Sequence, residues 1–219
     1  MKKALLFGAS GFIGSYLLEL LLADNDYEQI IIIVRKNIGI SHPKLKVLIG
    51  DFHTLPQLKA ELVADDIFIA LGTTKKQSPD PKIYYQIDHD YPVLAAALAK
   101  ANGAKSVFLV SSVGADANSP IFYTKIKGET ERDIIALDFE HTHVFEPSML
   151  LGNRQQHRPM EKIWIQLFAV INPLLAGGLH KYKGIDGRDV AKAMLNATKK
   201  QSEKVKIYEW REMTDLLSI

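Results

Sequence analysis

The sequence predicts an α/β protein with a doubly wound parallel sheet, and two observations carry this prediction. Short apolar, β-branched runs alternate along the chain with longer amphipathic stretches, which is the pattern of βαβ units. The apolar runs are continuous, as in residues 30–34, and this indicates strands that are buried on both faces. Right-handed crossovers between such strands place helices on both sides of the sheet.

The elements follow one another from end to end without a break. We expect strands at residues 4–7, 29–34, 45–49, 66–70, 106–110 and 142–145, and helices at 12–23, 91–101 and 124–137. No linker, repeat or change of composition divides the chain. The sequence therefore predicts a single domain over residues 1–219, in which residues from about 146 to 219 form a small C-terminal cap over the carboxyl edge of the sheet.

Composition excludes several classes of function. Apolar residues make up 47% of the 219 residues and the formal net charge is +2, which is too small to indicate a nucleic-acid partner. The absence of cysteine excludes disulfides, thiol catalysis and Cys-ligated zinc, and it fits a reducing compartment. Residues 163–179 are apolar but interrupted by polar ones, so we expect a buried helix there and no membrane span. These observations predict a cytoplasmic protein with no nucleic-acid or membrane partner.

No metal site is predicted. His141 and His143 alternate on one strand and share a face, but a third ligand at fixed spacing is missing. Ordinary polar strand residues are the better interpretation of both.

A glycine-rich turn, Gly8-x-x-Gly11-x-x-Gly14, joins the first strand to the first helix. Side chains at these positions would collide with a bound pyrophosphate or with a neighbouring strand, and the helix N-terminus attracts phosphate groups. In this strand–turn–helix context the motif predicts dinucleotide binding, with a ligand-free turn as the alternative. The expected cofactor contacts are Gly8, Ser10, Gly11, Phe12, Ile13 and Gly14.

The end of the second strand decides between the two nicotinamide cofactors. An NAD site usually has an acidic residue there for the ribose hydroxyls, whereas this chain has Arg35 and Lys36. A guanidinium and an ammonium would bind a 2′-phosphate, so the sequence favours NADP(H) over NAD(H). The alternative is that both are solvated loop charges.

Candidate catalytic residues follow the fifth strand. Ser112 lies at its carboxyl end, and Tyr123 and Lys127 form a Y-x-x-x-K pattern on the next predicted helix. Residues i and i+4 share one helical face, and a cation beside a phenol favours the phenolate. Tyr123 would then act as general acid or base on a carbonyl or alcohol, Ser112 would hold the same oxygen, and Lys127 would also bind the nicotinamide ribose. A surface Tyr–Lys pair is the alternative.

Together these residues resemble an atypical, truncated short-chain dehydrogenase/reductase, and within that superfamily the Tat-interactive-protein-like oxidoreductases. The stretches that carry the resemblance are residues 71–76, 88–91, 111–116, 127–129 and 151–159. It extends over nearly the whole chain. The resemblance implies an NAD(P)-binding Rossmann fold with Ser112, Tyr123 and Lys127 in the catalytic positions. It also implies that Asp51 lies near the adenine and that Leu71, Gly72 and Thr73 line the cofactor.

One departure from that pattern concerns the substrate. Related reductases often read Arg-Pro-Gly after the sixth strand, where this chain has Glu146 followed by Pro147 and Ser148. An anion there argues against an anionic substrate group at that point. The candidate substrate contacts are Ser111, Arg154 and Arg158, although the two arginines could equally form surface salt bridges.

The function that the sequence favours is hydride transfer between NADPH and a small carbonyl or alcohol. An NADPH-binding regulatory or scaffold protein is one alternative, because little chain follows the sixth strand. A nucleotide-sugar epimerase is another, against which the short cap argues. The substrate stays unidentified, and a homodimer or a protein partner is possible. Residues 209–219 are a candidate docking helix or dimer contact.

Overall fold

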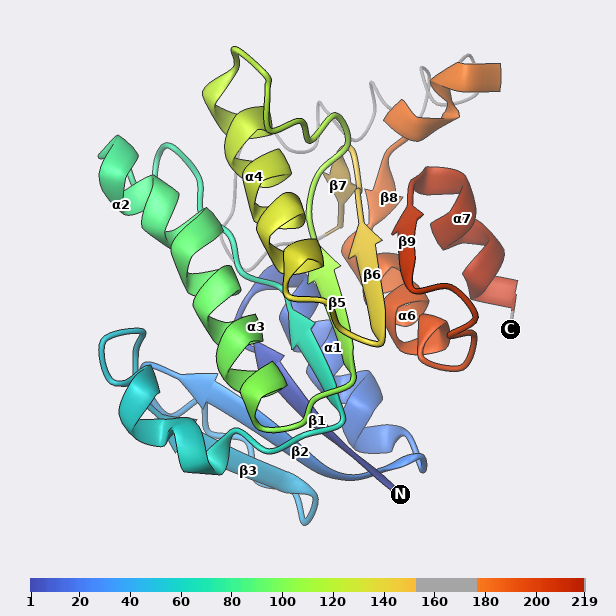
Figure 1. Cartoon of the computed structure of the whole chain (residues 1–219). Coiled ribbons are helices and arrows are strands. Elements are labelled where there is room, and N and C mark those ends of the chain that lie inside the picture. The colour runs from blue at the N-terminus through green and yellow to red at the C-terminus, as the bar shows by residue number, and fades with distance from the viewer. Residues whose placement is uncertain (153–176, 219) are drawn as a thin grey trace.

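The structure of this chain is a computed structural model that describes residues 1–152 and 177–218 (Figure 1). Arg154, Arg158 and most of the apolar stretch 163–179 therefore lie outside the described residues. Within the described ranges, no helix has the length and apolar character that a bilayer crossing requires.

One parallel sheet of 7 strands forms the centre of the molecule, in the order β3-β2-β1-β4-β5-β6-β9. Its strands are β1 (Lys2–Phe7), β2 (Tyr27–Val34), β3 (Leu45–Ile49), β4 (Asp66–Ile69), β5 (Ser106–Val110), β6 (His141–Phe145) and β9 (Val205–Tyr208). The strand order reverses between β1 and β4, and ligands of open α/β sheets bind outside the carboxyl ends of strands at such a point. The predicted fold class, a doubly wound parallel sheet, is confirmed.

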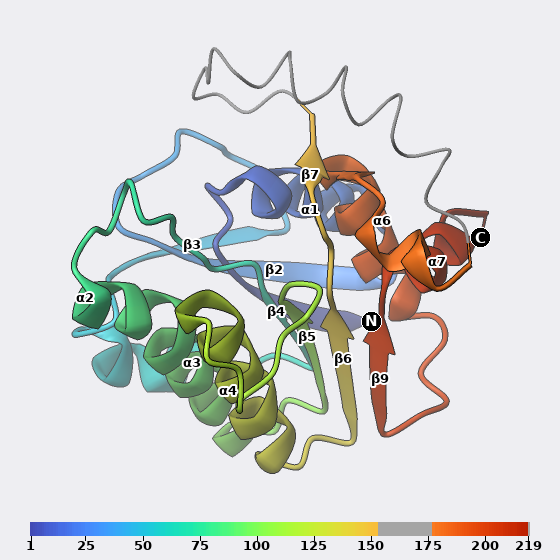
Figure 2. The same cartoon turned by 90° about the horizontal axis from the view of Figure 1, so that it is seen from above.

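Helices cover both faces of this sheet, as Figure 2 shows from above. One face carries α1 (Phe12–Ala23), α6 (Gly187–Ala197) and α7 (Trp210–Asp215), and the other carries α3 (Tyr91–Ala101) and α4 (Phe122–Ala136). Shorter elements are η1 (Leu55–Glu61), α2 (Pro81–Tyr85), the π-helical turn η2 (Gln86–Asp90), η4 (Gly177–Tyr182) and η5 (Leu216–Ser218). A separate two-stranded pair joins β7 (Leu150–Leu151) to β8 (Ile185–Asp186).

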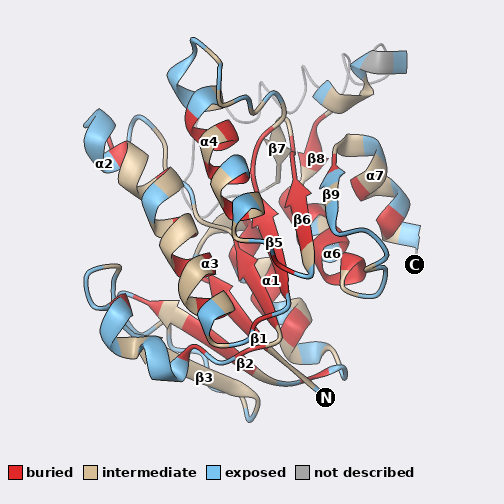
Figure 3. Ribbon diagram, viewed as in Figure 1, coloured by how far each residue is buried: buried red, intermediate tan, exposed pale blue. Residues whose placement is uncertain are grey.

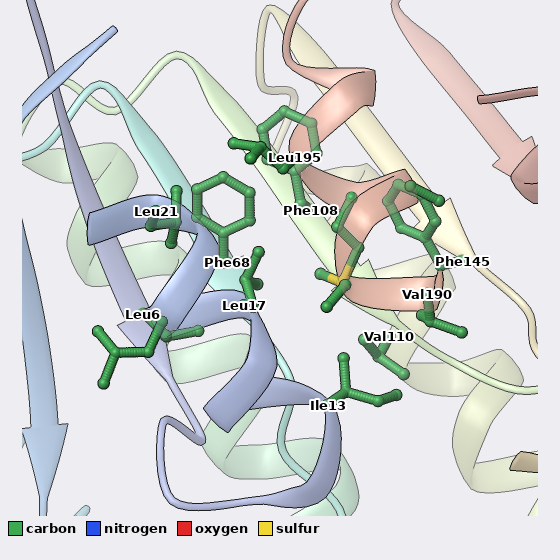
Figure 4. Packing of buried hydrophobic residues seen from close by; sticks show 14 of the residues in the cluster. Leu6, Ile13, Leu17, Leu21, Phe68, Phe108, Val110, Phe145, Val190 and Leu195 are labelled. Carbon is green, nitrogen blue, oxygen red and sulfur yellow. The ribbon is translucent and has the colours of Figure 1, made fainter. Parts of the chain in front are cut away.

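The core consists of two apolar layers, one on each face of the sheet. Ala4 and Leu6 of β1 belong to the layer under α1 and α6, whereas Leu5 and Phe7 belong to the layer under α3 and α4. Figure 4 shows the first layer, in which α1 and α6 pack over phenylalanines from the central strands. Strands β4 and β5 are buried at every position, and β1 is buried from Ala4 to Phe7 (Figure 3), which is why their sequences are mostly apolar.

The carboxyl-terminal third contributes to the main layers as well as to the carboxyl edge. The sequence analysis missed β9, a short edge strand in which Val205 and Ile207 are exposed and only Tyr208 is buried. Helix α6 follows β8, and its first turn is capped by the Asp186 carboxylate, which accepts the Arg188 N–H at 2.8 Å. Met213 and Leu216 are buried, so the terminal segment packs against its own chain.

The two histidines of β6 have structural surroundings. His143 is fully buried, stacks on Phe108 and lies 2.9 Å from the Tyr208 hydroxyl. Burial lowers the pKa of His143 to about 4, so the ring is neutral at physiological pH. The described residues contain no cluster of three potential metal ligands.

Candidate functional site

A cleft of about 640 Å³ opens at the carboxyl edge of the sheet, where the strand order reverses. Its walls come from the glycine turn and first turn of α1, the segments after β4 and β5, and the start of α4. The predicted site residues that line it are Ser10, Gly11, Phe12, Ile13, Leu71, Gly72, Thr73, Ser111, Tyr123 and Lys127. The fold thus joins the predicted phosphate turn and the Y-x-x-x-K helix in one cavity.

The glycine turn is compressed to a degree that only glycine permits. Gly8 has φ +88°, and a Cβ on it would lie 2.4 Å from the Ala70 carbonyl oxygen of the neighbouring segment. A Cβ on Gly14 would lie 2.0 Å from the Gly8 carbonyl oxygen, so α1 packs directly on the turn. The N-cap of α1 is Gly11, which brings no side chain to the helix N-terminus. A pyrophosphate therefore fits this end of the cleft, because backbone N–H groups and the helix dipole face it.

Replacing Gly14 by alanine is expected to damage both the fold and the phosphate end of the cleft. The new Cβ would displace the Gly8 carbonyl, and we expect the free energy of unfolding to fall by at least about 2 kcal/mol. Urea denaturation measures this loss, with Glu19→Ala on the exposed face of α1 as the matched control. A Gly14→Ala protein as stable as the control would contradict the close packing described here.

The segment after β4 is tied to α4 through Asp88, a residue that the sequence analysis had quoted only within the resemblance. One carboxylate oxygen of Asp88 accepts the Thr73 N–H at 2.8 Å, and the other lies 2.9 Å from Lys127 Nζ. The Asp88 and Lys127 side chains are 1% and 8% exposed, so this is a buried ion pair. Asp88 thus connects the predicted cofactor loop to the predicted catalytic lysine.

The position of Asp88 follows from a break in the helical hydrogen bonding. Pro92 has no N–H to donate to the Asp88 carbonyl one turn earlier, and the helix forms the π-helical turn η2 at this point. The Asp88 carbonyl instead accepts the Thr130 hydroxyl of α4 at 2.9 Å. A charged residue four positions before a helical proline was the sequence signal that could have revealed this site.

Tyr123 and Lys127 lie one turn apart at the start of α4, as the spacing predicted, and both border the cleft. The Tyr123 side chain is 40% exposed at the cleft mouth, whereas Lys127 is buried deeper. Gly128 allows the loop after β5 to lie against α4, because a Cβ there would be 2.2 Å from the Ala117 nitrogen. The helix therefore presents a solvent-accessible phenol and a buried cation to the same cavity.

The two serines after β5 have different positions. Leu109 of β5 belongs to the layer under α3 and α4, and strand alternation directs Ser111 to that same side. Ser111 borders the cleft, and its hydroxyl donates to the Glu131 carboxylate of α4. Ser112, the predicted catalytic serine, is buried beside it and is outside the set of cleft-lining residues.

The remaining predicted cofactor contacts lie away from the cleft wall. Arg35 and Lys36 are exposed just beyond β2. Asp51 is also exposed, and its carboxylate accepts the backbone N–H groups of His53 and Thr54 at 2.9 and 3.0 Å. The hydrogen bonds from Thr54 lower the pKa of Asp51 below its usual range. Gly8 and Gly14 act through packing beneath the turn rather than at the surface of the cleft.

Comparison with known proteins decides the family. A family model described as NAD(P)H-binding matches residues 8–161, which include the glycine turn, Asp88 and the Y-x-x-x-K helix. The chain belongs to the NAD(P)H-binding family. Its seven-stranded parallel sheet and its glycine turn are the Rossmann-type features that this family is expected to have.

Curated relatives of this NAD(P)H-binding protein confirm the resemblance drawn from the sequence. It is 33% identical over 206 residues to Protein FMP52, mitochondrial, of Candida glabrata, covering 93% of this chain and 88% of that protein. It is 32% identical over 199 residues to Protein HTATIP2 of Rattus norvegicus, covering 89% and 80% respectively. The chain is thus a relative of the atypical short-chain dehydrogenases/reductases.

Solved structures similar to this NAD(P)H-binding protein share its fold. A UDP-N-acetylglucosamine 4-epimerase from Methanobrevibacter ruminantium matches with a TM-score of 0.70 at 19% identity, over 95% of this chain and 76% of that one. The Bordetella bronchiseptica enzyme WbmH in complex with NAD+ matches with a TM-score of 0.70 at 18% identity, over 95% and 75%. At these identities the similarity establishes the fold alone.

The comparisons correct one expectation. The sequence predicted a cytoplasmic protein, from the absence of cysteine and of a membrane span. The fungal FMP52 relatives, including those of Candida glabrata, Kluyveromyces lactis and Aspergillus niger, carry the word mitochondrial in their names. The cytoplasmic prediction is therefore wrong; the absence of cysteine bears on redox conditions and does not identify a compartment.

Proposed function

We propose that this protein is an NADP(H)-dependent oxidoreductase that interconverts a small carbonyl compound and its alcohol. The observation that carries the proposal is the single cleft that joins the glycine turn of α1 to Tyr123 and Lys127 of α4. A cofactor whose pyrophosphate lies at the turn would extend along that cleft toward α4. The NAD(P)H-binding family and its short-chain dehydrogenase/reductase relatives support an enzyme of this class.

The chain supplies the proton and the charge that such a reaction needs. The bound reduced cofactor would supply a hydride to the carbonyl carbon. Tyr123 donates its phenolic proton to the carbonyl oxygen, which yields the alcohol and leaves a phenolate. Lys127, one helical turn away, stabilises that phenolate electrostatically. We assign the substrate oxygen to the Ser112 hydroxyl, which lies next to the cleft-lining Ser111, because the Ser111 proton is engaged by Glu131.

Arg35 and Lys36 support NADP(H) as the preferred cofactor. Both follow the second strand of the sheet, beside the glycine turn, where the adenosine ribose of a dinucleotide lies in this fold. No ion pair engages either cation within residues 1–152 and 177–218. Two cations there favour a 2′-phosphate over a ribose hydroxyl.

The test of this proposal is calorimetric titration of the protein with NADPH and with NADH. We expect micromolar NADPH binding and much weaker NADH binding. The double variant Arg35→Ala/Lys36→Ala should weaken NADPH binding by roughly tenfold or more and leave NADH binding nearly unchanged, because charge-assisted hydrogen bonds contribute about 1.5–3 kcal/mol each.

A matched control removes two exposed cations at the opposite edge of the sheet. Lys199→Ala/Lys200→Ala carries the same change of charge, and Lys199 lies near Met1 and Lys2 at the amino edge. Equal loss of NADPH affinity in both double variants would mean that only the overall charge matters. Absence of binding by either cofactor would contradict the proposed function as a whole.

A further inference from the structure

The buried ion pair between Asp88 and Lys127 borders the cleft, and the reaction proposed above uses only its cation. The Asp88 side chain is 1% exposed and that of Lys127 is 8% exposed, yet both residues line the cavity. The loop after β4 lies close to the pair, because a Cβ on Gly72 would be 3.6 Å from Asp88 Oδ1 and 3.9 Å from Lys127 Nζ. A ligand in the cleft therefore meets the carboxylate together with the ammonium.

Three contacts hold Asp88 in this position. One carboxylate oxygen accepts the Thr73 N–H at 2.8 Å, and the other lies 2.9 Å from Lys127 Nζ. The Asp88 carbonyl accepts the Thr130 hydroxyl at 2.9 Å. The carboxylate cannot turn away from Lys127 without leaving the Thr73 N–H unpaired, which has a free-energy cost. The geometry therefore fixes the negative charge beside the ammonium.

Asp88 supplies the main opposing charge to Lys127. It is the only residue that forms an ion pair with Lys127 within the described part of the chain. Glu131, one turn further along α4, acts on Lys127 electrostatically, but its carboxylate accepts the Ser111 hydroxyl. Burial strengthens the interaction of close charges, because the surroundings of the pair screen them less than water does. Removal of the Asp88 carboxylate would thus leave the ammonium largely unbalanced.

A positive charge at Lys127 has opposite effects on the two ends of the proposed reaction. It stabilises the phenolate that forms at Tyr123 when the carbonyl oxygen is protonated. The nicotinamide ring, however, is neutral in NADPH and cationic in NADP+, and Lys127 is expected to bind the ribose attached to that ring. An unbalanced ammonium would consequently repel the oxidised cofactor and oppose hydride transfer from the reduced one.

We propose that Asp88 is the counter-ion that lets the cleft accept the oxidised cofactor, because its carboxylate offsets the repulsion between the Lys127 ammonium and a cationic nicotinamide ring. Asp88 is a positioning residue, which holds the ammonium and balances its charge but takes no part in proton or hydride transfer. The neutral pair allows both redox forms of the cofactor to bind. The inference rests on the proposed function, which brings the nicotinamide end of the cofactor to this part of the cleft.

The charge of the nicotinamide ring provides a direct probe of this role. The 2′-phosphate and the pyrophosphate are common to NADP+ and NADPH, so their contributions cancel in the ratio of the two dissociation constants. Asp88→Asn keeps the size of the side chain and an acceptor for the Thr73 N–H. We expect the Kd of NADP+ divided by that of NADPH to rise by roughly threefold to tenfold in this variant, as one partly screened charge allows.

Two further variants give the sign of the effect. Lys127→Met leaves the carboxylate without its cation, so its ratio should fall below that of the wild type. Asp88→Asn/Lys127→Met removes both charges, and its ratio should return to within about twofold of the wild type. A merely structural role of Asp88 would weaken the binding of both cofactors alike and leave the ratio unchanged. Calorimetry at neutral pH measures all the dissociation constants.

The matched control is Asp133→Asn, which removes the same charge from α4. Asp133 pairs with His89 and Arg132 and does not line the cleft, so the ratio of this variant should equal that of the wild type. A ratio that does not rise in Asp88→Asn, or that rises equally in the control, would overturn the proposed counter-ion. If circular dichroism shows that Asp88→Asn is unfolded, a ratio that does not fall in Lys127→Met would do so. Failure of the wild type to bind either cofactor would instead overturn the proposed function.

Discussion

A Tyr123→Phe protein is expected to lose nearly all turnover while it keeps its affinity for NADPH. The hydroxyl is the only part of the side chain that the substitution removes, and loss of a general acid typically lowers the rate by 10²–10⁴-fold. The ring itself remains at the mouth of the cleft, where Tyr123 is 40% exposed. Oxidation of NADPH, followed by its absorbance with a panel of small aldehydes and ketones, measures the rate.

The control for this prediction is Tyr85→Phe. Tyr85 of α2 contacts His89 and does not line the cleft, so removal of its hydroxyl should leave the rate nearly unchanged. Calorimetric titration should give NADPH dissociation constants within about twofold of the wild type for both variants. Equal activity of Tyr123→Phe and the wild type would rule out the proposed proton transfer.

Loss of the Asp88 carboxylate is expected to have the largest effect on stability. Asp88→Ala leaves the buried Lys127 ammonium without its partner and the Thr73 N–H without its acceptor. Breaking a buried ion pair in this way typically costs 3–5 kcal/mol, and we expect a loss of about that size in the free energy of unfolding. Urea denaturation at neutral pH measures the loss.

Three variants test the explanation. Asp88→Asn keeps an oxygen that can accept the Thr73 N–H, so its free energy of unfolding should fall less than that of Asp88→Ala. Asp88→Ala/Lys127→Met removes both charges, so it should be more stable than Asp88→Ala alone. Glu61→Ala breaks the exposed pair with Lys46 and should cost below about 1 kcal/mol. A loss in Asp88→Ala no larger than that of Glu61→Ala would show that the buried pair does not stabilise the fold.

Much of the fold could be predicted because its signals are local. The run of residues 30–34 has no polar position, and this property of a doubly covered strand is visible without any tertiary information. The glycine turn could also be predicted from the sequence, since Gly8, Gly11 and Gly14 have the spacing that a strand–turn–helix junction requires. By contrast, β9 is short, and two of its apolar residues are exposed, so its pattern fits a loop as well as an edge strand.

The candidate site also has features that the sequence could predict and features that it could not. The i, i+4 spacing of Tyr123 and Lys127 predicted a shared helical face, and α4 carries them as expected. The partner of Lys127 could not be predicted, because Asp88 lies far from it in sequence and is brought to it by the π-helical turn. The serine that faces the cleft also depended on a strand direction that adjacent residues in the sequence do not reveal.

The sequence by itself determined the fold class, the position of the glycine turn and the helix that carries the tyrosine and lysine, because each depends on residues close together in the chain. Only the tertiary structure decided which charges meet. It paired Lys127 with Asp88, connected Ser111 to Glu131, and placed Glu146 among other carboxylates at the carboxyl edge. These contacts join separate elements, and their strength depends on burial, which exists only once the layers have packed.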